Sequence, residues 1–386
     1  MANQLNCQTA TLIDDKLYFL DGKNFGNNFF YLDVSIPFNT QKIIWQYLKN
    51  LNTVPAHSAA TSVKGGANNK TLFLYGGIPI NNATMSLVYT FNTQKKSWSI
   101  PKITGDNTVR KDNLKGIADN KGLMYLFGGH SNTEGTYFND MLILDTVNLN
   151  WKIGNSVNAP SPRSLYGAAL LSNHYIIYLG GLSDEKTIVS LKEVYLYNTI
   201  NDSWNTKVTL GKAPSNRSSF SAVLVTSIPG LNGQQIIIFG GYVESQDSLY
   251  VLDLLNFVWY IPKISGKIPS SRHWHQANVI RKYMVISFGA GYDPAIDDDI
   301  LLLDISNDQE YVWTNIYDPP TSSKSSSVTL PISAIVGIVI GSLIGGMLLS
   351  FGGFFLFIWN KNMKESINTI PKPGCEDAHG QEYIPE

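Results

Sequence analysis

Cysteine is almost absent from this 386-residue chain, which contains only Cys7 and Cys375. Two thiols so far apart provide neither a disulfide framework nor a C-x-x-C metal site. Charge is also scarce: charged residues make up 15% of the chain, and the formal net charge is −1. These shortages exclude a small disulfide-stapled domain and argue against nucleic-acid binding, which needs a basic surface.

What the chain does contain is a pattern that occurs six times: an apolar strand ending in a glycine pair, a second apolar strand ending in Asp or Asn, and then a tryptophan. The glycine sites are Asp21-Gly22, Gly76-Gly77, Gly128-Gly129, Gly180-Gly181, Gly240-Gly241 and Gly289-Ala290. The second strands end at Asp33, Asn92, Asp145, Asn198, Asp253 and Asp304, and the tryptophans are Trp45, Trp98, Trp151, Trp204, Trp259 and Trp313. Such self-similarity identifies a repeat architecture.

Each part of the repeat predicts a local structure. The strands are short, apolar and rich in aromatic or β-branched residues, as strands buried on both faces are. The glycines supply backbone angles that a Cβ disfavours, and they allow neighbouring chain to approach closely. The Asp or Asn that follows can close a turn by accepting hydrogen bonds from its own backbone. An additional strand with small residues, such as Ala168-Ala169, precedes each glycine strand. Four strands per unit, repeated radially, predict an all-β propeller in which each tryptophan packs between adjacent sheets.

These units resemble kelch repeats, and residues 1–317 resemble a six-bladed kelch β-propeller. The first and last copies depart from the pattern, because Asp21 replaces the first glycine of one pair and Ala290 the second of the other. Kelch propellers occur in intracellular adaptors, in cell-surface proteins of the attractin and muskelin type, and in the central domain of galactose oxidase. The resemblance therefore implies a fold and leaves the function open.

The C-terminal part predicts a membrane anchor. Residues 318–330 are rich in Pro and Ser and read as a stalk, residues 331–359 as a single transmembrane helix, and residues 360–386 as a short polar tail. No charge interrupts residues 332–359, which are long enough to cross a hydrocarbon core of about 30 Å. Ser333, Gly337, Gly341 and Gly345 recur every four residues, a spacing that favours close helix approach and a helix-mediated homodimer.

Lysines around this segment favour one orientation. Lys361 and Lys364 follow it, against Lys324 before it, so we expect a cytosolic tail and an extracellular or lumenal propeller. Residues 1–13 do not have the pattern of a signal peptide. The orientation therefore requires either further residues upstream of Met1 or insertion after translation, directed by the C-terminal helix.

Basic side chains recur where the first strand of each unit begins. Gln4, His57, Arg110, Arg163, Arg217 and Arg272 follow one another at intervals of 53–55 residues, so a closed ring brings them together. Guanidiniums are strong donors to carboxylate, sulfate or phosphate. Some kelch modules hold acidic peptides with arginines at such positions, so the resemblance implies this role for Arg110, Arg163, Arg217 and Arg272. The spacing adds His57 to the same rim, and the expected ligand is a protein or a glycan. The alternative is that each arginine braces its own blade by bonding loop carbonyls or a neighbouring carboxylate.

No enzyme or cofactor is predicted. The copper site of galactose oxidase, built from histidines, tyrosines and a cysteine-linked tyrosine, has no counterpart in this sequence. His273 and His275 would point to one face of a strand, as two ligands of one metal must, but a third ligand is not identifiable. The leading hypothesis is a single-pass membrane protein whose propeller binds a protein or glycan ligand without catalysis. A tail-anchored cytosolic adaptor and, less favoured, a copper oxidase are the alternatives.

Overall fold

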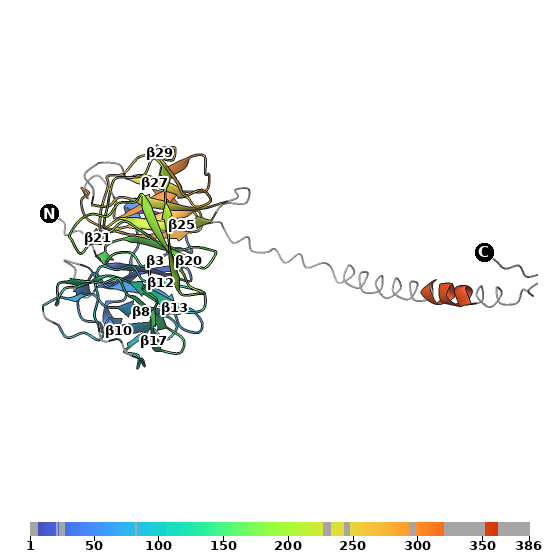
Figure 1. The fold of residues 1–386 in the computed structure, drawn as a ribbon, viewed down its shortest axis with the longest axis horizontal. Coiled ribbons are helices and arrows are strands. Elements are labelled where there is room, and N and C mark those ends of the chain that lie inside the picture. The colour runs from blue at the N-terminus through green and yellow to red at the C-terminus, as the bar shows by residue number, and fades with distance from the viewer. Residues whose placement is uncertain are drawn as a thin grey trace, which may run out of the picture. The chain divides into compact units, whose positions relative to one another are not determined.

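The structure of the protein is a computed structural model that describes residues 7–20, 22, 28–81, 83–105, 107, 109–226, 233–242, 248–293, 298–319 and 352–361. The chain divides into two compact units, Met1–Pro319 and Pro320–Glu386. The first unit contains six antiparallel blades, each built from one continuous stretch of chain, so the strands of a blade have neighbouring colours in Figure 1. The six-bladed propeller is confirmed.

The first three blades are four-stranded sheets, in which the strands pair in chain order from the first strand outwards. Blade one contains β1 (Thr9–Ile13), β2 (Lys16–Leu20), β3 (Phe29–Asp33) and β5 (Gln46–Tyr47). Blade two contains β7 (Thr61–Gly65), β8 (Thr71–Tyr75), β10 (Val88–Asn92) and β11 (Ser97–Ser99). Blade three contains β12 (Ile117–Ala118), β13 (Leu123–Phe127), β16 (Met141–Asp145) and β17 (Asn150–Gly154).

The last three blades follow the same plan. Blade four contains β19 (Gly167–Leu170), β20 (Tyr175–Leu179), β22 (Glu193–Asn198) and β23 (Ser203–Val208). Blade five contains β25 (Ser221–Thr226), β26 (Gln234–Phe239), β27 (Leu249–Asp253), β28 (Val258–Tyr260) and β24 (Leu210–Gly211). Blade six contains β30 (Gln276–Ile280), β31 (Tyr283–Ser287), β32 (Ile300–Asp304), β33 (Tyr311–Thr314) and β29 (Ile264–Gly266). The fifth strands, β24 and β29, pair in parallel with the outermost strand, so these two blades exceed the four strands expected.

Short two-residue strands and 3-10 helices lie in the loops between the longer strands. The two-residue strands pair as β4 (Phe38–Asn39) with β34 (Ile316–Tyr317), β6 (His57–Ser58) with β9 (Ile78–Pro79), β14 (His130–Ser131) with β15 (Thr136–Tyr137), and β18 (Arg163–Ser164) with β21 (Leu182–Ser183). Two 3-10 helices, η1 (Thr40–Lys42) and η2 (Lys49–Leu51), lie in the loops after β4 and β5. The first strands of neighbouring blades contact one another all the way round, β1 to β7, β12, β19, β25, β30 and back to β1, and thereby surround a central channel.

The repeat tryptophans join each blade to the one before it. Trp151 of blade three packs edge-on against Tyr75 of blade two, with ring centroids 5.7 Å apart. The equivalent pairs are Trp204 with Phe127, Trp313 with Phe239, and Trp45 with Phe288, at 4.7, 5.4 and 5.5 Å. Trp151, Trp204, Trp259 and Trp313 are buried, whereas Trp45 and Trp98 are half-buried. The predicted packing of tryptophans between adjacent sheets is therefore confirmed.

The turn after each second apolar strand also forms as predicted. In all six blades the side-chain oxygen of the Asp or Asn accepts a hydrogen bond from the backbone N–H two residues later, at 2.8 to 3.0 Å. The residues are Asp33, Asn92, Asp145, Asn198, Asp253 and Asp304. This local closure sets up the hairpin that returns the chain to the tryptophan strand.

The junction between blades six and one has a larger aromatic cluster and an additional short strand pair. Phe288, Phe19, Phe30 and Trp45 form one aromatic cluster with edge-on and stacked contacts. The last propeller strand, β34, pairs with β4 of blade one, and the Tyr317 hydroxyl donates to the Val34 carbonyl at 3.0 Å. Aromatic packing and a short strand pair therefore seal the ring without exchanging a strand between the two blades.

The last glycine pair is displaced by one residue from the position expected. Phe288 and Gly289 have φ values of 55° and 102°, which match the glycine pairs of the other blades. The structural pair is thus Phe288-Gly289, and the Gly289-Ala290 alignment was wrong. Phe288 carries the ring that Trp45 stacks on, so the position is shaped by the junction between the blades.

In the second unit, residues 352–361 form an α-helix. Most of the predicted transmembrane segment, residues 331–351, lies outside the described residues, as do the tail after residue 361 and most of the stalk. In the part of the chain that the structure describes, no helix has the length and apolar character needed to cross a bilayer.

We predict that Trp151→Ala lowers the free energy of unfolding of the propeller by roughly 3 to 5 kcal/mol, because it removes a buried ring from the contact between two blades. Chemical denaturation followed by circular dichroism measures the change. Ile153→Ala on the same strand is the control: this side chain is 70% exposed, so a loss under about 0.5 kcal/mol is expected. Equal losses in the two variants would contradict the packing described.

Candidate functional site

Six hydrogen bonds between backbone atoms form a closed circle around one end of the channel. The N–H of Ala59 donates to the carbonyl of Cys7, Asn113 to Ala59, Leu165 to Asn113, Ser219 to Leu165, Trp274 to Ser219, and Cys7 to Trp274, at distances of 2.8 to 3.2 Å. Each blade contributes one residue, which lies two or three positions after the rim residue expected in that blade. We call the surface made by these six residues the channel mouth.

All six mouth residues adopt the same uncommon conformation. Their φ values lie between 55° and 58°, in the left-handed region, and none of them is glycine. A non-glycine residue in this region is uncommon and costs on the order of 1 kcal/mol, so the circle of hydrogen bonds must hold it there. The six side chains are of six different types. The backbone conformation is therefore repeated in every blade, whereas the side chain at the mouth is not.

The glycine pairs hold this circle in position. The N–H of Gly77 donates to the carbonyl of Lys111 in the next blade, at 2.9 Å, and a Cβ on Gly76 would lie 2.1 Å from that same oxygen. The equivalent acceptors are the carbonyls of Arg163, Arg217 and Arg272, which receive bonds from Gly129, Gly181 and Gly241 at 2.9, 3.0 and 2.9 Å. Only glycine leaves room for a carbonyl so close. The pair therefore positions the residue from which the next blade begins.

The rim arginines lie inside the blades. Arg163, Arg217 and Arg272 expose 2%, 0% and 0% of their surface. Arg217 donates to the carbonyls of Gly240 and Ser215 at 3.0 and 3.2 Å and to the Ser215 hydroxyl at 3.1 Å. Arg163 and Arg272 make comparable bonds to carbonyls of their own blades. The three guanidiniums lie 4.9, 5.3 and 3.8 Å from the centres of the Tyr195, Tyr250 and Tyr292 rings.

This burial corrects the expectation that these arginines line a binding rim. Arg163, Arg217 and Arg272 support the mouth from within and present no guanidinium to a ligand above it. Burial lowers the pKa of Arg163, as expected for a cation taken out of water.

The other residues expected at the rim, which are His57, Arg110 and Gln4, do not share the surroundings of these three arginines. His57 occupies the equivalent position in blade two, is 1% exposed, and places its Nδ1 2.8 Å from the Pro55 carbonyl. In blade three the equivalent residue is Lys111 and not Arg110, because the Lys111 carbonyl accepts the glycine bond. Arg110 instead donates to the carbonyls of Gly76 and Met85, at 3.1 and 2.7 Å. Gln4 lies outside the described residues.

Beside the mouth, blade three carries a paired acid and imidazole that the sequence did not indicate. Asp112 is 2% exposed and lies 3.2 Å from His130 Nδ1, and it also accepts from the Asn132 N–H at 3.0 Å. Burial raises the pKa of Asp112, against the opposing effect of His130. Lys111 forms an ion pair with Asp140 nearby, and burial lowers the pKa of the lysine.

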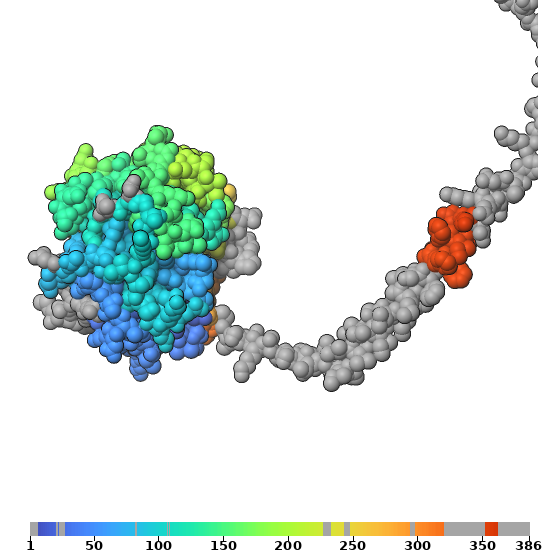
Figure 2. All heavy atoms as spheres, turned by 90° about the horizontal axis from the view of Figure 1, so that it is seen from below, coloured from blue at the N-terminus to red at the C-terminus, as the bar shows by residue number. Residues whose placement is uncertain are grey.

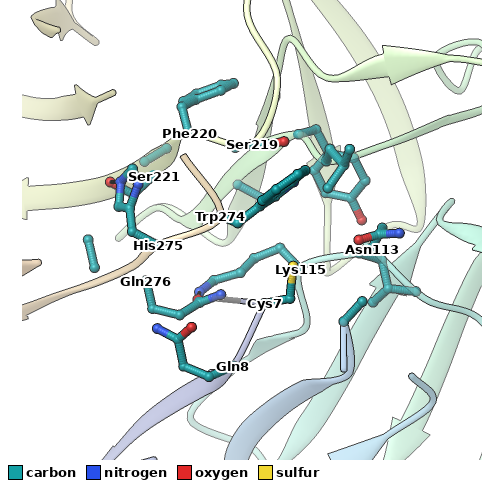
Figure 3. A pocket seen from close by; sticks show the side chains of 18 of the residues that line it. Cys7, Gln8, Asn113, Lys115, Ser219, Phe220, Ser221, Trp274, His275 and Gln276 are labelled. Atoms are coloured by element: carbon teal, nitrogen blue, oxygen red, sulfur yellow. Dashed lines mark hydrogen bonds between the residues drawn. The ribbon is translucent and has the colours of Figure 1, made fainter. Parts of the chain in front are cut away.

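A cavity of about 90 Å³ lies beneath the mouth, lined by residues from all six blades. Figure 3 shows Lys115 extending through it towards Gln276, with Cys7 beside it, Gln8 below and Trp274 above. Lys115 Nζ donates to Gln276 Oε1 at 3.0 Å, a bond from blade three to the opposite blade six. His275 faces Ser221, with its Nε2 2.9 Å from the hydroxyl, and burial lowers its pKa to about 3, so it stays neutral at physiological pH.

Three aromatic side chains gather at the mouth between blades five and six. The His273 ring lies 4.6 Å from Trp274 and 5.9 Å from Tyr242, both in edge-on geometry. Tyr242 is 61% exposed, and His273 and Trp274 are half-buried. We call these three residues the aromatic trio. No sequence signal identified it, because Tyr242 and Trp274 lie in different repeats and neither is part of the repeated pattern.

His273 and His275, which were expected from the sequence to lie on one face of a strand, do not share such a face. Trp274 between them has a φ of 55°, and β30 begins only at Gln276. His273 therefore contacts Tyr242, while His275 packs against Phe239. Across the described residues, no cluster of three or more His, Cys, Asp or Glu side chains could hold a metal ion.

Comparison with known proteins identifies relatives of the propeller. The family model described as the KLHDC2/KLHL20/DRC7 Kelch-repeats domain matches residues 7–229. Kelch domain-containing protein 3 of Rattus norvegicus is 25% identical over 249 residues, which are 61% of this chain and 63% of that protein. Host cell factor 1 of Rattus norvegicus is 27% identical over 251 residues, 61% of this chain and 12% of that protein. The chain thus spans less than two thirds of the length of these relatives. The solved structure titled "Structure of YjhT" shares the fold, with a TM-score of 0.61 at 14% identity, over 82% of this chain and 99% of that one.

Because Arg217 braces its blade, we predict that Arg217→Met lowers the free energy of unfolding by roughly 3 kcal/mol, since it leaves buried acceptors at Gly240 and Ser215 without their donor. Denaturant titration of the propeller measures this loss. Arg281→Met is the matched control, because Arg281 makes only a partly exposed ion pair with Asp15 at 3.1 Å and should cost under about 1 kcal/mol. Unchanged stability in Arg217→Met would show that the guanidinium is not a structural brace.

Proposed function

The chain belongs to the family of kelch-repeat propellers, and we propose from this premise that it is a membrane-anchored, non-catalytic module that binds a protein ligand at the channel mouth. The observation that carries the proposal is the aromatic trio. Interfaces are anchored by a few large side chains, among which Trp and Tyr are enriched. Tyr242 and Trp274 are such side chains, held on a rigid scaffold at a surface where the six blades present different chemistry.

Polar groups elsewhere around the mouth suit the same role. Asp112 and His130 lie beside the mouth on blade three, while Asn113 and Ser219 form part of the mouth itself. Aromatic anchors with a polar margin are the usual anatomy of a protein interface. Arg163, Arg217 and Arg272, which were predicted to bind, support this surface indirectly, because their carbonyls and guanidiniums fix the backbone from which the mouth side chains project.

Photocrosslinking tests the proposed docking surface. A photoreactive phenylalanine analogue at position 242 of the full chain, in the cells that produce it, should yield a discrete protein adduct. The same analogue at position 153, where Ile153 is 70% exposed on the outer edge of blade three, should not. Trp274→Ala should remove the adduct, because loss of an anchor of this kind costs about 2 kcal/mol or more, roughly a thirtyfold fall in affinity. An adduct only at position 153, or one indifferent to Trp274→Ala, contradicts docking at the mouth.

The membrane anchor and its orientation are part of the proposal and rest on the charge-free segment and on Lys361 and Lys364. In a Cys7→Ser variant, Cys375 is the remaining cysteine of the chain. We predict that a membrane-impermeant maleimide labels Cys375 only from the cytosolic side, and labels a cysteine introduced at the exposed Val147 only from the opposite side. The reverse pattern, with Val147→Cys labelled from the cytosol, would favour the tail-anchored adaptor.

A further inference from the structure

Lys115 occupies an unusual place for a lysine. It extends from blade three into the channel cavity, where its Nζ reaches Gln276 on the far side (Figure 3). At the corresponding inner positions of blades four and five the chain has the small residues Gly167 and Ser221, neither of which reaches across the channel as Lys115 does. The amine is therefore held by one neutral acceptor, inside a cavity of about 90 Å³.

The surroundings of this lysine, as far as the structure describes them, contain no carboxylate paired with its ammonium form. Within the described residues, the hydrogen bond to Gln276 is accompanied by no ion pair of Lys115. The titratable groups that share the cavity lining are Cys7, Tyr166 and His275. Burial keeps His275 neutral and raises the pKa of Tyr166. Lys115 is half-buried, and the burial of its amine lowers the pKa to about 8, so near neutral pH an appreciable fraction of the side chain is a free amine.

We propose that Lys115 is a covalent capture site for small aldehydes, which it binds as a reversible imine inside the channel. A desolvated lysine in a pocket is the arrangement that activates an amine towards carbonyl compounds. The cavity sets the size of the ligand: at about 90 Å³ it is smaller than the roughly 150 Å³ that accommodates benzene, so only a few carbon atoms fit. This inference is independent of the protein ligand proposed for the mouth.

The reaction needs no oxidant and no co-reactant. The Nζ lone pair attacks the carbonyl carbon, a C–N bond forms, and the carbonyl oxygen takes a proton to give a carbinolamine. Loss of that hydroxyl as water produces the C=N bond, and addition of water reverses the sequence. The protonated imine retains one positive charge and one N–H, which can donate to Gln276 Oε1 in place of the ammonium. The bond across the channel is therefore conserved in the adduct.

Reductive trapping on the full chain tests the proposal. Propanal and cyanoborohydride at pH 7.4 convert an amine imine into a stable propylamine, whereas a thiol adduct at Cys7 is not reduced, and peptide mass mapping then locates the label. Lys115 should be labelled about tenfold faster than the exposed Lys121, because its larger fraction of free amine outweighs the lower nucleophilicity that accompanies a lower pKa. Labelling of Lys115 no faster than Lys121 overturns the proposal.

Two further measurements separate capture in the cavity from surface reactivity. A pyrene aldehyde, too large for the cavity, should label Lys121 and leave Lys115 unmodified, and equal labelling of both would contradict an enclosed site. Gln276→Glu places a carboxylate against the amine and favours its charged form, so labelling of Lys115 should fall to the rate of Lys121 or below. Unchanged labelling in that variant, with the melting temperature preserved, would show that the environment of the channel does not activate the amine.

Discussion

The closed circle of six backbone hydrogen bonds around the channel mouth is the constraint on which the rest of the propeller depends. It includes one residue from each blade and runs through the junction between the last and first blades on the same terms as through the others. A ring of this kind fixes the relative position of all six inner strands, because each hydrogen bond forms only when the two blades that it joins are correctly placed. The cost of six left-handed residues, on the order of 1 kcal/mol each, is offset by that closure.

The remaining repeated features serve the same circle from outside. Glycine pairs admit the carbonyl of the next blade, arginines bond the start of blades four, five and six to loops of the same blade, and tryptophans hold neighbouring sheets together at their edges. The propeller, whose successive segments adjoin from blue to green in Figure 2, is built from these common parts. The side chains at the mouth differ from blade to blade. The functions proposed for this molecule rest on what is not repeated: the aromatic trio with the Asp112–His130 pair, and Lys115.

The sequence predicted the fold of the propeller nearly completely, because the residues that define a blade each act through their own side chain. Trp151 and the capping Asp145 can be recognised one at a time, and six copies remove the ambiguity of any single one. The alignment of the repeats was harder to predict where a backbone atom determines it. Arg110 and Lys111 are adjacent basic residues, and only the carbonyl that accepts the hydrogen bond from Gly77 shows that Lys111 is equivalent to Arg163. The sequence could not predict the channel mouth either, because its six residues share a left-handed backbone conformation and no side-chain type.

Amide hydrogen exchange of the six mouth residues tests the central claim most directly. If the circle is one cooperative unit, the N–H groups of Cys7, Ala59, Asn113, Leu165, Ser219 and Trp274 should be strongly protected, with protection factors within about tenfold of one another. Cys7 is decisive, because its bond to Trp274 crosses the junction between blades six and one. Rapid exchange at Cys7 alongside slow exchange at Leu165 would show a propeller that opens at that junction and would contradict the account.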